Sequence, residues 1–190
     1  MSFVIQKHSL RLDTSTYTLE DIKREIKEDF DILISLGYID LMDKKVKIEW
    51  GKALKQYGSC SKARNQTIPG VTTYVIKINQ NYIRVGSPED VHNTIMHECL
   101  HCIDGCFNHG PRWRAAASKV NANFTFSPIE RCGSDDGYKE FLSTKAKYQI
   151  TCKTCNHTWN YFRKTRTFAS CANGKARCTC GGREFECVEL

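Results

Sequence analysis

The sequence lacks the features of a membrane-inserted or exported protein. No apolar run approaches the ~18 residues that a membrane-spanning helix requires. Residues 1–8 do not show the basic start and apolar stretch that are typical of a secretory signal. These two absences predict a protein that makes no contact with a membrane and that works inside the cell, in the cytoplasm.

A complete disulfide framework and internal repeats are also missing. The 190 residues include 11 cysteines, and an odd number leaves at least one thiol unpaired. Because no export signal precedes them, we expect the cysteines to stay reduced and some of them to bind zinc. The length and the 41% of hydrophobic residues predict one domain of ordinary size with a small appendage, in a monomeric chain.

Acidic residues are missing from residues 145–183, although cations are frequent there. The cations are Lys145, Lys147, Lys153, Arg163, Lys164, Arg166, Lys175, Arg177 and Arg183. The net charge of the whole chain is +7. An uninterrupted positive segment predicts a local field that attracts a polyanion such as nucleic acid. The alternative is a solvated basic face that only aids solubility.

The spacing of apolar residues predicts the main elements of the fold. In chain order they are a helix over 18–36, strands over 45–50, 74–78 and 82–85, a helix over 87–104 and a second helix from 111 onward. This order favours an α+β fold over a parallel α/β one. The polar segment 131–146 is typical of a linker, so we predict two domains, 1–130 and 147–190.

The predicted helix over 87–104 carries the pattern H-E-x-x-H at residues 97–101. His97 and His101 are four residues apart and so lie one turn apart on the same helix face, where both can bind one Zn²⁺. Glu98 can take a proton from a water molecule that the metal activates. The pattern therefore predicts a catalytic zinc site, and peptide-bond hydrolysis is the reaction that it favours.

A catalytic zinc site needs a third protein ligand and one open position. His109 is one candidate, because Gly105 and Gly110 allow the chain to fold back over the metal after the helix ends. Asp104 is the rival, since it lies seven residues after His97 and keeps nearly the same helix face. We favour His109, in which case Asp104 could orient an imidazole. The alternative to a metal site is a surface helix with two unrelated histidines.

Four cysteines of the C-terminal segment have the spacing of a zinc ribbon: Cys152, Cys155, Cys178 and Cys180. The usual second C-x-x-C would place a cysteine at position 177, where this chain has Arg177. The third ligand is therefore open, and Cys171 is the alternative to Cys178. We predict a structural zinc ion here, which brings the total to two per chain.

Aromatic and cationic residues alternate between the two cysteine pairs. Arg163, Lys164 and Arg166 could meet phosphates, and the Trp159 ring could stack on a base. Such a surface suits single-stranded or distorted DNA. The rings could instead pack the small ribbon or dock it on the first domain. If DNA is bound, the protein would be found at the nucleoid or in the nucleus.

Together these motifs resemble the SprT-like family, the relatives of the Spartan protease. The resemblance rests on His97-Glu98-x-x-His101, on His109-Gly110-x-x-Trp113 and on the C-x-x-C ribbon that follows. Upstream, residues 57–61 and 76–79 resemble the substrate-side strand of the family. The resemblance covers roughly residues 15–185 and implies a minimal zincin-like metalloprotease core followed by a small C-terminal zinc ribbon.

The resemblance also implies roles and a substrate. His97, His101 and His109 would be the zinc ligands, and Glu98 the general base. Spartan-type relatives cleave proteins crosslinked to DNA, so a DNA-bound protein is the implied substrate. The spacer between His101 and His109 is shorter than in Spartan and closer to that of short bacterial or phage members.

Two other functions are compatible with the same residues. One is a nucleic-acid-binding zinc protein whose H-E-x-x-H site performs no hydrolysis. Glu98 argues against it, because a purely structural metal site has no use for that carboxylate. The other is a metal-dependent amidohydrolase that acts on a small amide.

Overall fold

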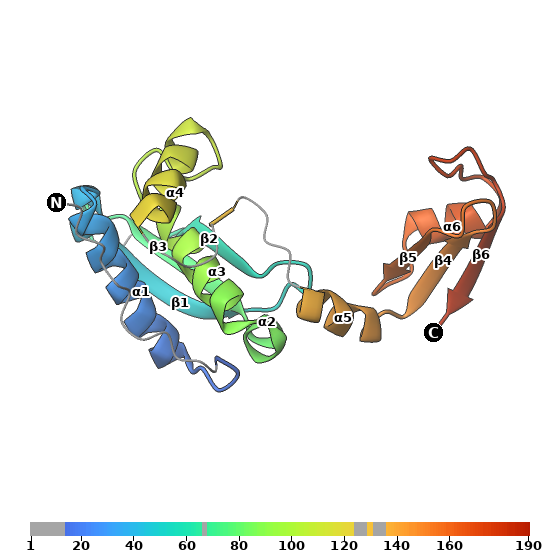
Figure 1. The fold of residues 1–190 in the computed structure, drawn as a ribbon, viewed down its shortest axis with the longest axis horizontal. Helices are drawn as coiled ribbons and strands as arrows, with labels where there is room; N and C mark the ends of the chain where they lie inside the picture. The colour runs from blue at the N-terminus through green and yellow to red at the C-terminus, as the bar shows by residue number, and fades with distance from the viewer. Residues whose placement is uncertain (1–13, 66–67, 124–128, 131–135) are drawn as a thin grey trace. The chain divides into compact units, whose positions relative to one another are not determined.

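The computed structural model describes residues 14–65, 68–123, 129–130 and 136–190. The chain divides into two compact units, Met1–Tyr138 and Lys139–Leu190 (Figure 1). The division falls within the segment 131–146, where the composition favours a linker. Part of that segment is helical, as α5 (Asp136–Thr144). No helix of the described ranges has both the length and the apolar character needed to cross a bilayer.

The sheet of the first unit has three strands: β1 (Lys45–Gly51), β2 (Gly58–Lys62) and β3 (Thr73–Asn79). Their order is β1-β3-β2, with β1 parallel and β2 antiparallel to the central β3. Tyr74, Ile76 and Ile78 alternate along β3 and are buried. The mixed α/β composition agrees with the expectation from the sequence, but one strand pair is parallel, so the sheet is mixed.

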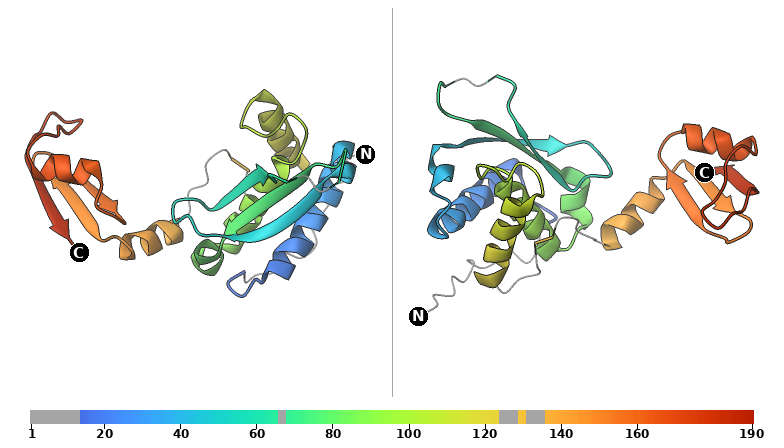
Figure 2. Two further views of the ribbon diagram at one scale, coloured as in Figure 1. Left: turned by 180° about the vertical axis from the view of Figure 1, so that it is seen from behind. Right: turned by 90° about the horizontal axis from the view of Figure 1, so that it is seen from above.

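The helical segments beside this sheet include α1 (Leu19–Ser35), the 3₁₀ helix η1 (Ile39–Asp43), α3 (Pro88–Leu100) and α4 (Pro111–Asn123). Figure 2 shows that α1, α3 and α4 lie on one face of the sheet. Thr18 forms a capping box with Asp21 at the start of α1. Ser87 caps α3 and Pro88 opens it. Ile22 of α1 and Ile95 of α3 are fully buried.

The strand predicted over 82–85 is wrong, because residues Gln80–Val85 form the short helix α2. Asn79 ends β3, and its side-chain oxygen accepts hydrogen bonds from the backbone N–H groups of Asn81 and Tyr82, at 2.9 and 3.3 Å. This N-cap starts a helix directly after the strand. Tyr82 and Ile83 are both buried, whereas successive strand residues would point to opposite faces.

The second unit begins within α5 and contains β4 (Tyr148–Cys152), β5 (Thr158–Tyr161), α6 (Arg166–Ala172) and β6 (Phe185–Glu189). The strands form an antiparallel sheet in the order β5-β4-β6. Its hydrophobic core is small and centres on Ile150, Phe168 and Cys171. A core of this size provides little folding free energy by itself, so a crosslink or a metal ion is needed to stabilise the unit.

Candidate metal centres

Three histidines meet at the C-terminal end of α3. His97 lies in the last turn of the helix, His101 is its C-cap, and His109 lies in the loop before α4. Their ligand nitrogens all lie within 4.8 Å of one another, and the Nε2 atoms of His97 and His109 are 2.9 Å apart. Gly105 has a φ of 80°, which allows the chain to reverse after the helix and bring His109 back.

Two backbone carbonyls orient the imidazoles. The Nδ1 atom of His97 lies 2.9 Å from the carbonyl oxygen of Glu130, and that of His101 lies 2.8 Å from the carbonyl oxygen of Cys106. A carbonyl can only accept a hydrogen bond, so each Nδ1 carries the proton. Each Nε2 then keeps its lone pair, which is the form that binds a metal ion.

Burial keeps the same histidines uncharged. Burial, together with the neighbouring His101 and His109, lowers the pKa of His97 to about 4. Burial also lowers the pKa of His101. Both imidazoles are therefore neutral at pH 7, and no proton has to leave them before a metal ion binds.

The structure brings His109, and not Asp104, to the other two histidines. The Asp104 carboxylate is 60% exposed and forms an ion pair with Lys44, at 2.8 Å. The backbone N–H of Asp104 donates to the Asp40 carboxylate of η1, also at 2.8 Å. Asp104 thus ties the loop between His101 and His109 to η1. The idea that it orients an imidazole is wrong for the Nδ1 atoms of His97 and His101, which face carbonyls.

Glu98 lies beside the histidines and is almost fully buried, with 5% of its surface exposed. Burial raises the pKa of its carboxyl to about 8. A cation held by the neighbouring histidines would stabilise the carboxylate and lower this pKa again. The side chain packs against Gly58, where β2 begins.

Trp113 forms one wall of the site. Its ring centroid lies 4.8, 5.8 and 4.7 Å from those of His97, His101 and His109. The side chain is buried, with 2% of its surface exposed. Trp113 lies in the first turn of α4, and the loop before this helix brings His109 against its ring. The indole therefore shields one side of the histidine cluster from water.

The second unit contains a cluster of four cysteines: Cys152, Cys155, Cys178 and Cys180. Cys171 lies in the hydrophobic core of this unit and is not part of the cluster. Of the two candidates for the third sulfur, the structure thus brings Cys178 to the others. Arg177, where the usual pattern has a cysteine, donates from Nε to the carbonyl of Gly181, at 3.4 Å. This hydrogen bond closes the turn that contains Cys178 and Cys180.

Both clusters have dimensions compatible with zinc. Sulfur ligands at tetrahedral positions around Zn²⁺ lie about 3.8 Å apart. The Cys152–Cys180 and Cys155–Cys178 sulfur pairs are both 3.7 Å apart. Backbone N–H groups, chiefly that of Cys155, lower the pKa of the Cys152 thiol to about 6, which favours the thiolate that zinc needs. Tetrahedral nitrogen ligands would lie roughly 3.3 Å apart, close to the 2.9 Å between His97 and His109.

The predicted nucleic-acid residues lie in the second unit. Arg163, Lys164 and Arg166 are exposed. The Trp159 ring is half-buried; it packs against the small core and lies 4.5 Å from the His157 ring. The cations are thus available to a partner, while Trp159 also contributes to the packing of its own unit.

Several contacts of the site could not be expected from the spacing of its ligands. The carbonyls of Glu130 and Cys106 are backbone atoms, which carry no signal in the sequence. Gly58 belongs to the segment 57–61 that resembles the family's substrate-side strand, but its contact with Glu98 depends on how β2 packs on α3. Residue types alone therefore identify the ligands but not the groups that position them.

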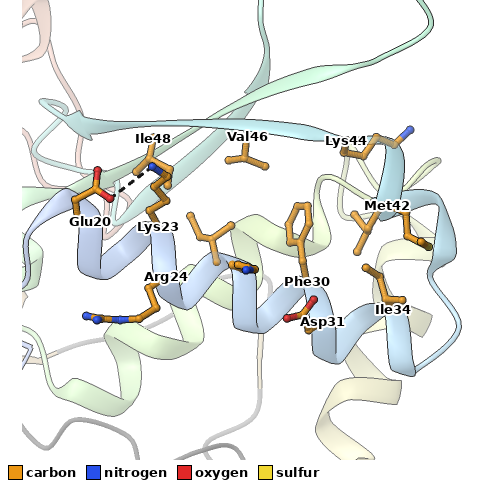
Figure 3. A pocket seen from close by; sticks show the side chains of 13 residues that line it. Glu20, Lys23, Arg24, Phe30, Asp31, Ile34, Met42, Lys44, Val46 and Ile48 are labelled. Atoms are coloured by element: carbon orange, nitrogen blue, oxygen red, sulfur yellow. Dashed lines mark hydrogen bonds and ion pairs between the residues drawn. The ribbon is translucent and has the colours of Figure 1, made fainter.

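Another hollow of the first unit contains none of these residues. It has a volume of about 530 Å³ and lies between α1 and β1 (Figure 3). Apolar side chains such as Phe30 and Val46 line it, and charged ones such as Lys23 and Asp31 also contribute. None of its lining residues belongs to either metal cluster. The candidate active site is therefore the histidine cluster.

Comparison with known proteins agrees with this location. The model of the SprT-like family matches residues 19–133, which is more than half of the chain and includes the three histidines and Glu98. The matched range ends before the four cysteines. A comparison with curated proteins finds no match.

Proposed function

Because the chain belongs to the SprT-like family, whose domains are metallopeptidase-like, we propose that it is a zinc-dependent peptidase of the H-E-x-x-H type with a zincin-like core. The observation that carries this proposal is the meeting of three imidazoles beside one buried carboxyl group. Three nitrogen ligands leave the fourth position of a tetrahedral site open, as catalysis requires. A structural site would be closed by a fourth protein ligand.

Glu98 is the proposed general base. When bound, zinc supplies Lewis acidity, which activates water and polarises a carbonyl. Glu98 accepts the proton that the water loses on attacking the peptide carbonyl, and later gives it to the leaving amine. Burial opposes the ionisation of this carboxyl and a bound metal ion favours it, and these opposing effects suit a group that both takes and gives up a proton.

The sheet supplies a place for an extended substrate. β2 is an edge strand, and its first residue lies against Glu98. The free edge of such a strand can pair with an extended peptide through backbone hydrogen bonds. We propose that the substrate is held in this way, with its scissile bond near Glu98. A pairing through backbone atoms favours a peptide over a small amide.

We further propose that the second unit is a zinc ribbon that recruits the enzyme to DNA and thereby to DNA-bound protein substrates, including crosslinked ones. The support is the exposure of Arg163, Lys164 and Arg166 in a segment without acidic residues. Four cysteine ligands make a closed site, which stabilises structure rather than catalysing a reaction. The half-buried Trp159 offers one ring edge or face for stacking on a base of single-stranded or distorted DNA.

The test is proteolysis by the zinc-loaded full chain, with a DNA-binding protein as substrate, in the presence and absence of single-stranded DNA. Glu98→Gln keeps the size of the side chain but cannot take a proton, so we expect a loss of roughly 10²–10⁴-fold in rate. Its zinc content should equal that of the wild type. An active Glu98→Gln variant would contradict the proposed mechanism. Cleavage of small amides alone would favour an amidohydrolase.

A further inference from the structure

Gly58 leaves no room for a side chain at the position where β2 meets Glu98. A methyl group added there would lie 2.7 Å from Oε1, 2.9 Å from Cγ and 3.1 Å from Cδ of Glu98. Rotation of the carboxylate would move Oε1 but not Cγ, so Glu98 would have to leave its rotamer. The close contact thus includes the Cγ atom of Glu98 as well as its carboxylate oxygen.

The backbone around Gly58 is fixed by neighbours on other elements. Gly58 pairs with Ile78 in the β2–β3 ladder, and the carbonyl of Tyr57 accepts a hydrogen bond from the backbone N–H of Asn79, at 2.8 Å. The Tyr57 ring stacks on Tyr82 at a centroid distance of 4.4 Å. A shift of β2 would break these interactions, so a methyl group at position 58 would move Glu98 instead.

Packing is also what holds the Glu98 carboxylate. Within the described residues, no hydrogen bond or ion pair of this carboxylate is seen, whereas His97 and His101 are each oriented by a carbonyl. The packing of Glu98 against Gly58 therefore restricts the carboxylate, as a hydrogen-bonding partner would do elsewhere. It confines the carboxylate next to the histidines and leaves both of its oxygens free for a proton.

We propose that Gly58 is a positioning residue, whose missing side chain sets the place of the general base Glu98 beside the metal site. This inference rests on the proposed function of Glu98. It predicts that Gly58→Ala lowers kcat by about a hundredfold, since a displacement near 1 Å can have that effect. KM and the zinc content should change little, because neither the ligands nor the edge of β2 is altered.

Gly51→Ala is the matched control, because Gly51 is also a strand glycine of this sheet. A methyl group there would lie 3.4 Å from its nearest neighbours, which is ordinary van der Waals contact. This variant should keep the wild-type kcat. If Gly58→Ala has a kcat within twofold of the wild type while Glu98→Gln is inactive, the inference about Gly58 is overturned and the proposed function stands.

A second measurement does not depend on activity. Glu98→Ala removes all three atoms that the methyl group would meet, so the two substitutions form a double-mutant cycle. Gly58→Ala should lower the urea midpoint of the full chain in the wild type, but not in the Glu98→Ala background. An equal loss in both backgrounds would mean that the substitution destabilises the backbone around position 58 independently of Glu98, which would overturn the inference. An active Glu98→Gln variant would instead overturn the proposed function, and with it a catalytic purpose for Gly58.

Discussion

The two candidate metal centres differ in what surrounds them. The histidine cluster lies in a unit with a substantial core, at the end of a buried helix, and has three ligands. The cysteine cluster lies in a unit with few buried residues, and two of its four sulfur-bearing residues are exposed. We therefore expect the first unit to fold without a metal ion and, as proposed, to use it for chemistry. We expect the second unit to depend on its metal ion for folding.

Metal removal should separate the two units most clearly. Apparent binding energies of structural zinc reach about 10 kcal/mol or more, which exceeds what the core around Ile150 and Phe168 can supply. We expect a chelator to unfold residues 148–189 while the first unit stays folded. Amide signals in two-dimensional NMR, recorded with and without the chelator, check this.

The same comparison can be made with variants. Replacement of Cys152 and Cys155 by Ser should lower the zinc content from two ions to one per chain, and should leave the hydrolysis of an unstructured peptide largely intact. A second unit that stays folded without zinc would contradict the assigned difference between the centres.

The ligands of the first centre can be tested next. His109→Ala removes a nitrogen from the cluster and should weaken zinc binding more than about a hundredfold, since even partners outside the ligand set contribute 10–100-fold. Asp104→Ala removes only the ion pair with Lys44 and should weaken binding less than about tenfold. Competition with a chromophoric chelator measures both affinities. A larger effect at Asp104 than at His109 would reverse the assignment.

Acidification should affect the two centres differently. The pKa of His97 is lowered to about 4, so between pH 7 and 5 no proton competes with zinc at this residue. The pKa of the Cys152 thiol is about 6, and that of Cys180 is raised, so protons compete with zinc at both sulfurs over that range. Zinc affinity should therefore fall more steeply at the cysteine centre as the pH is lowered.

Single-site proteins allow this measurement: Cys152→Ser with Cys155→Ser keeps the histidine centre, and His97→Ala with His101→Ala keeps the cysteine centre. Chelator competition at several pH values gives the slope of affinity against pH for each. Equal slopes would mean that the burial of the histidines does not protect them from protons.

The sequence predicts the chemistry of the site better than its surroundings. His97, His101, Cys152, Cys155 and Cys180 follow from spacing, because ligand geometry limits where such residues can stand. Spacing leaves the choice between Cys178 and Cys171 open, and the structure brings Cys178 to the other three cysteines. Gly105 and Gly110 favour His109 over Asp104, and the structure brings His109 to the other two histidines. The alternation of apolar residues also locates β1 and β3 correctly.

The rest depends on contacts between distant residues. Residues 82–85 have the composition of a strand, but the N-cap at Asn79 starts a helix there. Whether the cap or the strand propensity prevails depends on tertiary contacts, which the local sequence does not give. The carbonyls that orient His97 and His101 have no residue-type signal. The role of Gly58 depends on the approach of β2 to α3, which no local pattern encodes.

The smallest expected effect concerns DNA binding by the second unit. If Arg163, Lys164 and Arg166 contact phosphates, DNA affinity should fall steeply with salt, because each neutralised phosphate releases counterions. Their joint replacement by Ala should weaken binding and make the logarithmic salt slope shallower, by about 0.7–0.9 for each phosphate that the variant no longer neutralises. Trp159→Ala should lower the affinity for single strands with little change in slope, since stacking releases few ions. Fluorescence anisotropy of a labelled oligonucleotide across a salt series measures both quantities. An unchanged affinity in the triple variant would mean that these cations only aid the solubility of the second unit. The two units would then differ in their dependence on a metal ion, but the second unit would have no role in binding DNA through these residues.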